Sequence, residues 1–411
     1  MNISFVHKRY ILSQEFFCAR IFHDSTIIGR ILRFVSCSAI LSQKIIELFQ
    51  VQFDFKAKLS PCPIANAMIL AETKFGPVKM KTVLVTGGAG YVGSHCVKAL
   101  SQAGYRPVVF DNFSTGHRDF VRWGTAIEGD VRDVEALASA IGKIQPVAVM
   151  HFAALSLVGQ SVEQPDLYAE VNCGGTRNLL EAMAAKNVSA LVFSSTAAVY
   201  GEPDTNLISE DTEKKPGNPY GETKLACEEM IRASEAGHGI RSVCLRYFNA
   251  AGADPDEEIG EHHLPETHLI PIILDAALGR REAIQIFGND YPTADGTAVR
   301  DYVHVSDLGN AHVAALGHLL DGGDTLALNL GSGLGASVMD VIGAARRVTS
   351  SEIQTTDSPR RPGDPPWLVA NPEAAREKLS WQTMRSDIDT IVADAWAWHR
   401  KRFTPEIISE E

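Results

Sequence analysis

A tyrosine and a lysine stand four positions apart in the segment Tyr220-Gly221-Glu222-Thr223-Lys224. If this segment is helical, both side chains lie one turn apart on the same face. A phenol with an ordinary pKa of about 10 is a weak base at neutral pH, and a neighbouring positive charge favours the phenolate. The pair could therefore take up and return a proton, although this spacing alone also occurs on solvated helix faces.

Hydroxyl groups precede this pair in Ser194-Ser195-Thr196, which follows an apolar run. The pattern places Thr196 at the carboxyl end of a predicted strand. Its hydroxyl could bridge a substrate oxygen and the phenol of Tyr220, which makes Tyr220, Lys224 and Thr196 the catalytic candidates.

Three glycines, Gly87, Gly90 and Gly93, follow another apolar run at G-x-x-G-x-x-G spacing. Glycines permit a tight turn, and the backbone of the loop, including Tyr91 and Val92, can approach a pyrophosphate at the positive end of the next helix. Glycine clusters also occur in ordinary turns. The order strand, loop, helix favours a dinucleotide-binding loop here.

An acidic residue, Asp111, ends the next apolar run, 18 positions after Gly93. A carboxylate there accepts hydrogen bonds from the adenosine ribose and repels a 2′-phosphate, which favours NAD over NADP. The alternative is a simple turn residue before Asn112. Further cofactor candidates follow the next two predicted strands, where ordinary packing is the other interpretation: Asp130, Val131, Phe152, Ala153 and Ala154.

From residue 81 onward, short β-branched runs alternate with amphipathic segments of helical length, which is typical of a doubly wound parallel sheet, the α/β Rossmann fold. The predicted strands are Thr82–Val85, Pro107–Phe110, Ala126–Glu128, Val147–Met150, Ala190–Phe193 and Arg241–Leu245. The predicted helices are Gly93–Ala103, Val134–Ile141, Leu167–Ala185 and Tyr220–Ala236. After Gly252 this alternation of strands and helices ends. The sequence therefore predicts a Rossmann domain over 80–255 and a smaller C-terminal α/β substrate domain over 256–411.

Composition argues against several classes of partner and site. The chain has 411 residues, 45% of them hydrophobic, and a formal net charge of -12. It holds no apolar stretch of bilayer length and no compact basic run, so neither a membrane nor a nucleic-acid partner is expected. The seven cysteines lack C-x-x-C spacing, which argues against a zinc site or a disulfide framework, and no metal is expected.

Residues 1–79 differ from the rest, with ten Lys and Arg against five Asp and Glu and only two glycines. A targeting peptide and a small extra domain are both possible interpretations. The favoured interpretation is that Met80 is the natural start and that this extension is not part of the enzyme fold.

Five further segments extend the pattern: Phe193-Ser194-Ser195-Thr196-Ala197-Ala198-Val199-Tyr200-Gly201, Asn218-Pro219-Tyr220-Gly221, Leu245-Arg246-Tyr247-Phe248-Asn249, Ile286-Phe287-Gly288-Asn289-Asp290-Tyr291-Pro292-Thr293 and Val299-Arg300-Asp301-Tyr302. With these segments, residues 80–399 resemble the extended short-chain dehydrogenase/reductases, in particular the UDP-glucose 4-epimerase family. The resemblance implies a cytoplasmic, NAD-dependent isomerase of UDP-hexoses. It also implies a homodimer that pairs through the helices predicted at Leu167–Ala185 and Tyr220–Ala236.

The resemblance also implies roles for single residues. Tyr220 matches the family's catalytic base, Lys224 its partner and Thr196 a proton relay. Asn172 and Phe248 match cofactor contacts. The residues that match contacts to the UDP-sugar are Asn249, Arg300, Arg361 and Asp364. Bidentate guanidinium groups suit a diphosphate, and surface salt bridges are the alternative for the arginines.

Two positions depart from the family's pattern: Ser156 stands where several members have lysine, and Leu368 aligns with the position that limits room beside the sugar C2. Preference for UDP-glucose, UDP-N-acetylglucosamine or a UDP-pentose therefore stays open. A dehydratase is disfavoured, because Ala197 and Ala198 follow Thr196 where dehydration needs an Asp-Glu pair. A non-catalytic NAD-binding regulator is disfavoured because both Tyr220 and Lys224 are present.

Overall fold

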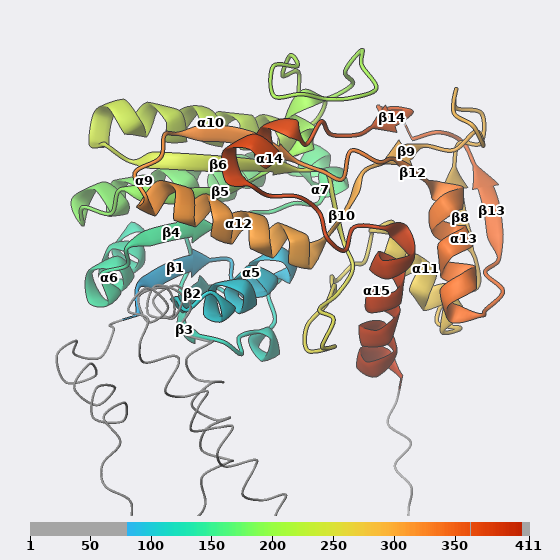
Figure 1. The fold of residues 1–411 in the computed structure, drawn as a ribbon, viewed down its shortest axis with the longest axis horizontal. Coiled ribbons are helices and arrows are strands. Elements are labelled where there is room, and N and C mark those ends of the chain that lie inside the picture. Colours follow the sequence, from blue (N-terminus) through green and yellow to red (C-terminus); the bar gives the residue numbers. More distant parts are fainter. Residues whose placement is uncertain (1–79, 362, 405–411) are drawn as a thin grey trace, which may run out of the picture. The chain divides into compact units, whose positions relative to one another are not determined.

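The computed structural model describes residues 80–361 and 363–404, so the predictions for residues 1–79 lie outside the described part. A seven-stranded parallel sheet forms its centre (Figure 1), with the order β11-β6-β5-β4-β1-β2-β3. The strands are β1 Thr82–Thr86, β2 Arg106–Asp111, β3 Thr125–Glu128, β4 Ala148–His151, β5 Ala190–Thr196, β6 Arg241–Tyr247 and β11 Leu326–Leu330.

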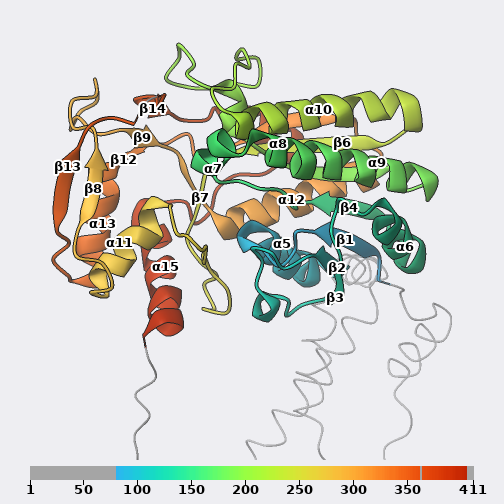
Figure 2. The same cartoon turned by 180° about the vertical axis from the view of Figure 1, so that it is seen from behind.

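Helices cover both faces of this sheet, as Figures 1 and 2 show from opposite sides. On one face lie α5 Tyr91–Gln102 and α12 Val305–Leu320, and on the other α6 Val134–Ile144, α9 Gly175–Ala185 and α10 Pro219–His238. Side chains alternate along each strand, so Val83 and Val85 join the core under α5 and α12, whereas Leu84 joins the core under α6 and α9. Burial on both faces explains why the strands read as continuous apolar runs.

The order in which the chain adds strands to the sheet reverses between β1 and β4. After β1 it adds β2 and β3 on one side, and β4 then pairs with the other side of β1, with Thr86 opposite His151. In open α/β sheets, ligands bind outside the carboxyl ends of the strands at such a switch point. The sheet therefore places the ends of β1, β2, β4, β5 and β6 around one site.

A second group of elements surrounds a separate apolar core. It includes α11 Leu269–Ala277, α13 Val338–Thr349, α15 Ile388–Phe403 and the paired strands β8 Ile284–Phe287 and β13 Thr355–Ser358. Two further small sheets pair β7 Asn249–Ala251 with β10 Tyr302–His304, and place β9 Val299–Arg300 between β12 Ala336–Ser337 and β14 Trp367–Leu368. The strand β11 and the helices α12 and α14 (Glu373–Leu379) return to the large sheet, so residues 256–411 contribute to both groups.

The predicted fold class is confirmed, and each of the six predicted strands is present with ends shifted by a few residues. The helix predicted over Leu167–Ala185 is not continuous. It consists of α8 Pro165–Tyr168, a π-helical turn at Ala169–Gly174, and α9. Short turns outside the predictions are α7 Val158–Glu163 and the 3-10 turns Arg118–Phe120 and Ala197–Tyr200.

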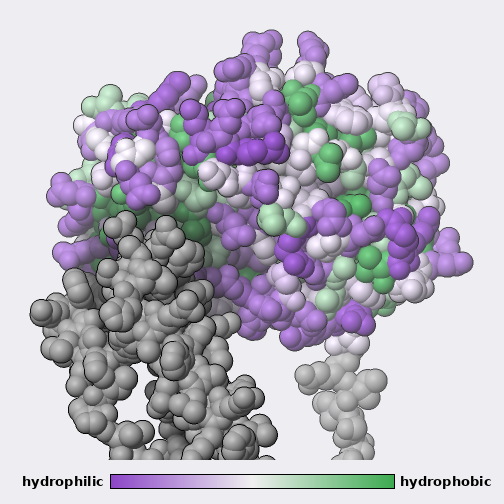
Figure 3. Space-filling view, viewed as in Figure 1, coloured by the Kyte–Doolittle hydropathy of each residue, from purple (hydrophilic) through white to green (hydrophobic). Residues whose placement is uncertain are grey.

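Among the described residues, no helix combines the length and apolar character needed to cross a bilayer. Figure 3 shows one face of the molecule, on which hydrophilic residues predominate and hydrophobic residues appear in small separate patches.

Candidate active site

The glycine-rich loop between β1 and α5 is shaped by its contacts with the end of β4. Gly87 has φ +70° and its N–H donates to the Phe110 carbonyl at 2.9 Å. A Cβ at Gly87 would lie 2.4 Å from the Ala153 nitrogen, and a Cβ at Gly93 would lie 2.2 Å from the Gly87 oxygen. Side chains at these positions would open the loop, so both glycines are required by space, and Gly87 also by its backbone conformation.

The helix that follows this loop begins without a side-chain cap. α5 begins at Tyr91 after Gly90, with no side-chain cap and no acidic residue in its first turn. The first N–H groups of a helix have no partner within the helix, and they bind anions readily. The loop residues Gly87, Gly90, Tyr91, Val92 and Gly93 therefore fit the pyrophosphate of a dinucleotide.

Asp111 ends β2 and holds this loop in place. Its Oδ2 accepts from the Ala89 N–H at 3.0 Å and its Oδ1 from the Phe113 N–H at 2.8 Å. Burial raises the pKa of Asp111 above its ordinary value. Each oxygen retains a lone pair, so the carboxylate can still accept a ribose hydroxyl.

The other cofactor candidates beyond β2 and β3 lie close to one another. The Asn112 amide donates to Asp130 at 2.9 Å, and Arg132 forms an ion pair with Asp130 at 2.8 Å. Hydrogen bonding to Arg132 holds the pKa of Asp130 well below its usual range. Val131 is buried against Gly175, where a Cβ would lie 2.6 Å from its side chain.

The segment after β4 runs beside the glycine loop. The Ala153 N–H donates to the Thr86 carbonyl at 3.1 Å, and Ala154 follows at the same edge of the sheet. The Phe152 ring lies 4.8 Å from the ring of His312, which is buried under the sheet. Small residues here let the backbone lie against a bound ligand.

Asn172 lies on the π-helical turn and fixes the loop after β4. Its Oδ1 accepts from the Leu155 N–H at 2.8 Å, and its amide donates to the Leu155 carbonyl and the Thr223 hydroxyl, both at 3.1 Å. The side chain therefore ties this loop to the catalytic helix α10. Single-turn π-helices are frequent at functional sites.

The catalytic candidates come from β5 and α10. Asn218 caps α10 by accepting from the Gly221 N–H at 2.9 Å, and the helix then presents Tyr220 and Lys224 toward the end of β5. Lys224 is 3% exposed, and its ammonium donates to the Ser194 carbonyl at 2.9 Å. Burial lowers the pKa of Lys224 to about 8. Thr196 ends β5, and its hydroxyl oxygen accepts from the Ala198 N–H at 3.1 Å.

The phenol of Tyr220 is not acidified by its protein surroundings. Burial raises the pKa of Tyr220 to about 12, and a hydrogen bond with the Thr196 side chain only opposes this shift. The expectation that Lys224 and the nicotinamide together favour the phenolate concerns the protein with bound NAD and stays a prediction.

A buried ion pair that sequence reasoning missed fixes α10 to the sheet. Glu228 lies one turn beyond Lys224 and binds Arg246 of β6 through both carboxylate oxygens, at 2.8 and 2.5 Å. The Ser195 hydroxyl donates to Glu228 at 2.5 Å, and Arg246 also donates to the Tyr200 hydroxyl at 2.9 Å. Helical spacing places Glu228 on the same face as Tyr220 and Lys224, but it does not indicate Arg246 as its partner.

The candidates for UDP-sugar binding lie on β9, on β7 and in the segment between β13 and β14. Arg300 of β9 forms an ion pair with Asp364, and the guanidinium of the exposed Arg361 lies 4.0 Å from the Phe287 ring centre. Asn249 begins β7, where its N–H donates to the Asp301 carbonyl at 3.0 Å.

A small apolar cluster joins these residues to the catalytic elements. Leu368 pairs with Arg300 in the β14–β9 register. It packs with Phe248 and with Leu225 of α10 against a core of Ala197, Val199, Tyr200 and Ile208. The cluster therefore contacts α10, which carries Tyr220 and Lys224, and β14, which pairs with Arg300.

Asp301 was also missed by sequence reasoning. It is fully buried and accepts hydrogen bonds from the N–H groups of Ser332, Gly333 and Ala370 and from the Ser332 hydroxyl. It therefore holds two loops against β9 and positions the neighbouring Arg300.

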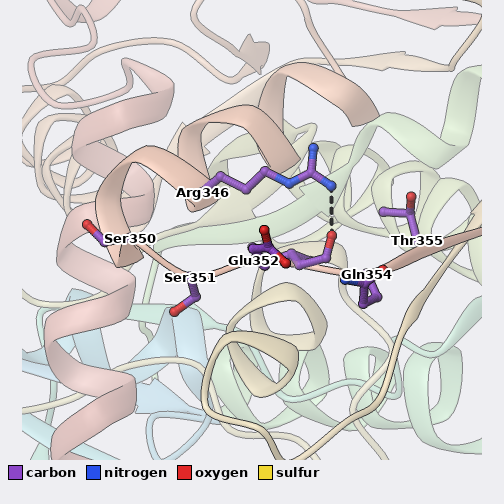
Figure 4. A pocket seen from close by; sticks show the side chains of 7 residues that line it. Arg346, Ser350, Ser351, Glu352, Gln354 and Thr355 are labelled. Carbon is purple, nitrogen blue, oxygen red and sulfur yellow. Dashed lines mark hydrogen bonds between the residues drawn. The ribbon is translucent and has the colours of Figure 1, made fainter.

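A hollow of about 590 Å³ lies elsewhere, at the end of α13 (Figure 4). Arg346 crosses it and donates to the Ile353 carbonyl at 2.7 Å. Its lining consists of Arg346 and residues 350–355, so it contains none of the predicted site residues.

Known proteins resemble this chain over the region that carries the site. Residues 83–331 match the model of the NAD dependent epimerase/dehydratase family. A UDP-glucose 4-epimerase from Rhizobium leguminosarum bv. trifolii is 51% identical over 321 residues, which cover 78% of this chain and 98% of that protein.

Solved structures agree with this relationship. The UDP-glucose 4-epimerase from Brucella ovis in complex with NAD is 48% identical, with a TM-score of 0.76 over 77% of this chain and 98% of that one. The enzyme from Bifidobacterium longum in complex with NAD+ and UDP is 35% identical, with a TM-score of 0.74 over 78% of this chain and 98% of that one. The chain therefore belongs to the NAD dependent epimerase/dehydratase family, and within it to the UDP-glucose 4-epimerases.

Proposed function

We propose that this chain is an NAD-dependent isomerase that interconverts UDP-glucose and UDP-galactose. The observation that carries the proposal is the meeting of Tyr220, Lys224 and Thr196 at the carboxyl edge of the sheet, beside a glycine loop shaped for a dinucleotide. The relatives described above, about half identical to this chain, bear the same activity in their names.

Bound NAD supplies reversible two-electron oxidation at the sugar C4. The loop residues 87–93 hold its pyrophosphate, Asp111 accepts from its adenosine ribose, and Lys224 donates to its second ribose. Tyr220 takes the proton of the 4-hydroxyl and returns it after the 4-keto sugar has rotated to present its other face. Thr196 lies between the phenol and the sugar oxygen. The sugar leaves with no net change in oxidation state.

The sugar nucleotide is held by its UDP part. Arg300 and Arg361 bind the diphosphate and nucleoside region, with Asp364 orienting Arg300 through their ion pair. Firm binding of UDP combined with weak binding of the hexose allows the intermediate to rotate, since tight uniform binding of the sugar would oppose that step. In this scheme residues 80–255 supply most of the cofactor site and residues 256–411 most of the nucleotide-sugar site.

The test is conversion of UDP-galactose to UDP-glucose by purified protein without added NAD. We expect turnover together with NAD released on denaturation. UDP-N-acetylglucosamine and UDP-xylose are assayed under the same conditions. If either is converted faster, it is the preferred substrate instead of UDP-glucose. Bound NAD without turnover of any UDP-sugar would instead support a non-catalytic regulator.

We further propose a cytoplasmic homodimer that pairs through α9 and α10. The helix α7 contacts α10 and exposes Val158 and Val162, whose exposed fractions are 46% and 63%, so an interface on α10 that extended onto α7 would bury both. Light scattering should give twice the mass of one chain, and Val162→Glu should shift the species toward the monomer. A wild-type monomer at micromolar concentration would contradict the dimer.

A further inference from the structure

One short turn, Ala197–Tyr200, contacts both Thr196 and the start of α10. The Thr196 Oγ1 accepts from the Ala198 N–H at 3.1 Å, so the turn holds the threonine side chain at one end. The turn also packs against α10, where the Ala198 carbonyl lies so close to Gly221 that a Cβ there would be 2.6 Å from the oxygen. The turn therefore touches one catalytic candidate and the residue that follows Tyr220.

The last residue of this turn is anchored by its hydroxyl group. Tyr200 is 1% exposed. The Arg246 guanidinium donates to the Tyr200 hydroxyl at 2.9 Å, and this hydroxyl donates to the Asn329 Oδ1 at 2.7 Å. A phenylalanine ring would fill the same space in the apolar cluster that Tyr200 shares with Val199 and Ile208. The hydroxyl therefore fixes a position rather than adding packing, because a buried polar network rigidifies the groups that it satisfies.

The first partner of this hydroxyl, Arg246, is itself tied to both catalytic elements. Arg246 binds both carboxylate oxygens of Glu228, which lies one turn beyond Lys224 on α10. Ser195, the neighbour of Thr196 on β5, donates to the same carboxylate. The contacts of the Tyr200 hydroxyl therefore lead through Arg246 back to β5 and α10.

The second partner, Asn329, is held from two further directions. It is fully buried on β11, opposite Arg246 in the β11–β6 register. Its backbone N–H donates to a Glu210 oxygen at 2.7 Å, and its Nδ2 donates to the Ile208 carbonyl at 2.9 Å. Because the amide nitrogen is directed to Ile208, the Oδ1 is the atom that accepts from Tyr200. Both residues that hold the hydroxyl are therefore fixed themselves.

We propose that Tyr200 is a positioning residue for the catalytic pair of Thr196 and Tyr220, a role that rests on the function proposed above. The Tyr200 hydroxyl bonds to Arg246 and Asn329, so it acts through the turn Ala197–Tyr200, which it keeps in place against Thr196 and α10. The sugar 4-hydroxyl must lie within hydrogen-bond reach of the catalytic pair, and a misplacement of about 1 Å can cost about 10²-fold in rate. Loss of the anchor therefore slows the chemical step while UDP is still bound.

The first experiment measures kcat and KM for UDP-galactose in the full-length Tyr200→Phe variant. We expect kcat to fall by about tenfold or more, while KM stays within about twofold of the wild type and the bound NAD is unchanged. A kcat within about twofold of the wild type would overturn the positioning role. A wild-type protein that turns over no UDP-sugar would overturn the proposed function, and this role with it.

Trp381→Phe controls for a general loss of stability. Trp381 is 5% exposed, and its Nε1 donates to the Asp307 carbonyl of α12 at 2.9 Å. This substitution also removes one buried hydrogen bond, but away from Thr196 and α10. Tm should fall in both variants, whereas only Tyr200→Phe should lose kcat at a temperature where both are folded. An equal loss of kcat in Trp381→Phe would show that Tyr200 acts only on stability and would contradict the proposal.

The second experiment adds Asn329→Leu and the double variant with Tyr200→Phe. Both single changes break the hydrogen bond between Tyr200 and Asn329, so their effects on kcat should not multiply. The double variant should turn over UDP-galactose at the rate of Asn329→Leu alone. A loss equal to the product of the two single losses would mean that the two residues act independently and would contradict the anchoring role of their hydrogen bond.

Discussion

Tyr220 lies where a catalytic base is expected, but its surroundings oppose ionisation of the phenol. Burial raises its pKa to about 12, and Lys224, whose pKa burial lowers to about 8, donates to a backbone carbonyl instead. A phenolate here is stable only beside an additional positive charge. The proton affinity of Tyr220 should therefore depend on whether the bound dinucleotide is oxidised, which couples proton removal to oxidation of the sugar.

The first prediction concerns the Tyr220 hydroxyl. Tyr220→Phe removes the only proposed acid–base group at the sugar oxygen, so we expect kcat to fall by about 10²–10⁴-fold with unchanged Tm and NAD content. Tyr105→Phe is the control, because Tyr105 precedes β2 at the opposite edge of the sheet. Undiminished turnover by Tyr220→Phe would refute the proposed role.

At the level of elements, the glycine loop yields a second prediction. Gly87→Ala places a methyl group 2.4 Å from the Ala153 nitrogen at φ +70°, so the loop must open and the purified protein should lose most of its bound NAD. Gly104 has φ +83° but nothing within 4 Å of an added Cβ. Gly104→Ala therefore carries the backbone strain alone, with a cost of about 1 kcal/mol and full NAD content. Equal NAD loss in both would show that strain, not the close contact, matters.

The ion pair between α10 and β6 yields a third prediction. Glu228→Gln leaves the Arg246 charge buried without its partner, which should lower the free energy of unfolding by about 3–5 kcal/mol. The exposed pair of Arg347 and Asp389 is the control, since Asp389→Asn should change stability by less than about 1 kcal/mol. Urea unfolding measures both, and a small effect of Glu228→Gln would mean that water reaches the pair.

The strands were predictable because burial on both faces gives short apolar runs. The candidate site residues were chosen because they follow these runs, and their roles stay predictions. The π-helical turn at Ala169–Gly174 was not predictable, since its sequence continues a helical pattern and the turn depends on Asn172 reaching Leu155 and Thr223. Glu228 and Arg246 are 18 positions apart, and nothing local indicates that they pair. Likewise, the spacing of Tyr220 and Lys224 could not show that the ammonium is directed to a carbonyl.

At the scale of the described molecule, the sheet is completed by a strand from far along the chain. β11 pairs with β6 over Leu326–Leu330, and α12 packs beside α5, so the region after residue 255 stabilises the cofactor-binding part. The sequence predicts a smaller substrate domain over 256–411, and this division stays a prediction; which strands pair cannot be read from a single sequence. The core that these regions share also encloses neutral histidines. The free energy of unfolding therefore depends on pH.

The last prediction concerns one of these histidines, His312 on α12. It is fully buried, its Nδ1 lies 2.8 Å from the Leu308 carbonyl, and burial lowers its pKa to about 4. Between about pH 6.5 and 4 the unfolded chain binds a proton that the folded protein excludes, so stability is lost as the pH falls, by up to about 1.4 kcal/mol per pH unit. His312→Leu should remove this contribution, and its free energy of unfolding should fall less steeply than that of the wild type below pH 6.5. Leu316→Ala, a buried change on the same helix that cannot titrate, controls for general destabilisation and should keep the wild-type slope. Parallel profiles for His312→Leu and the wild type would mean that His312 is protonated in the folded protein.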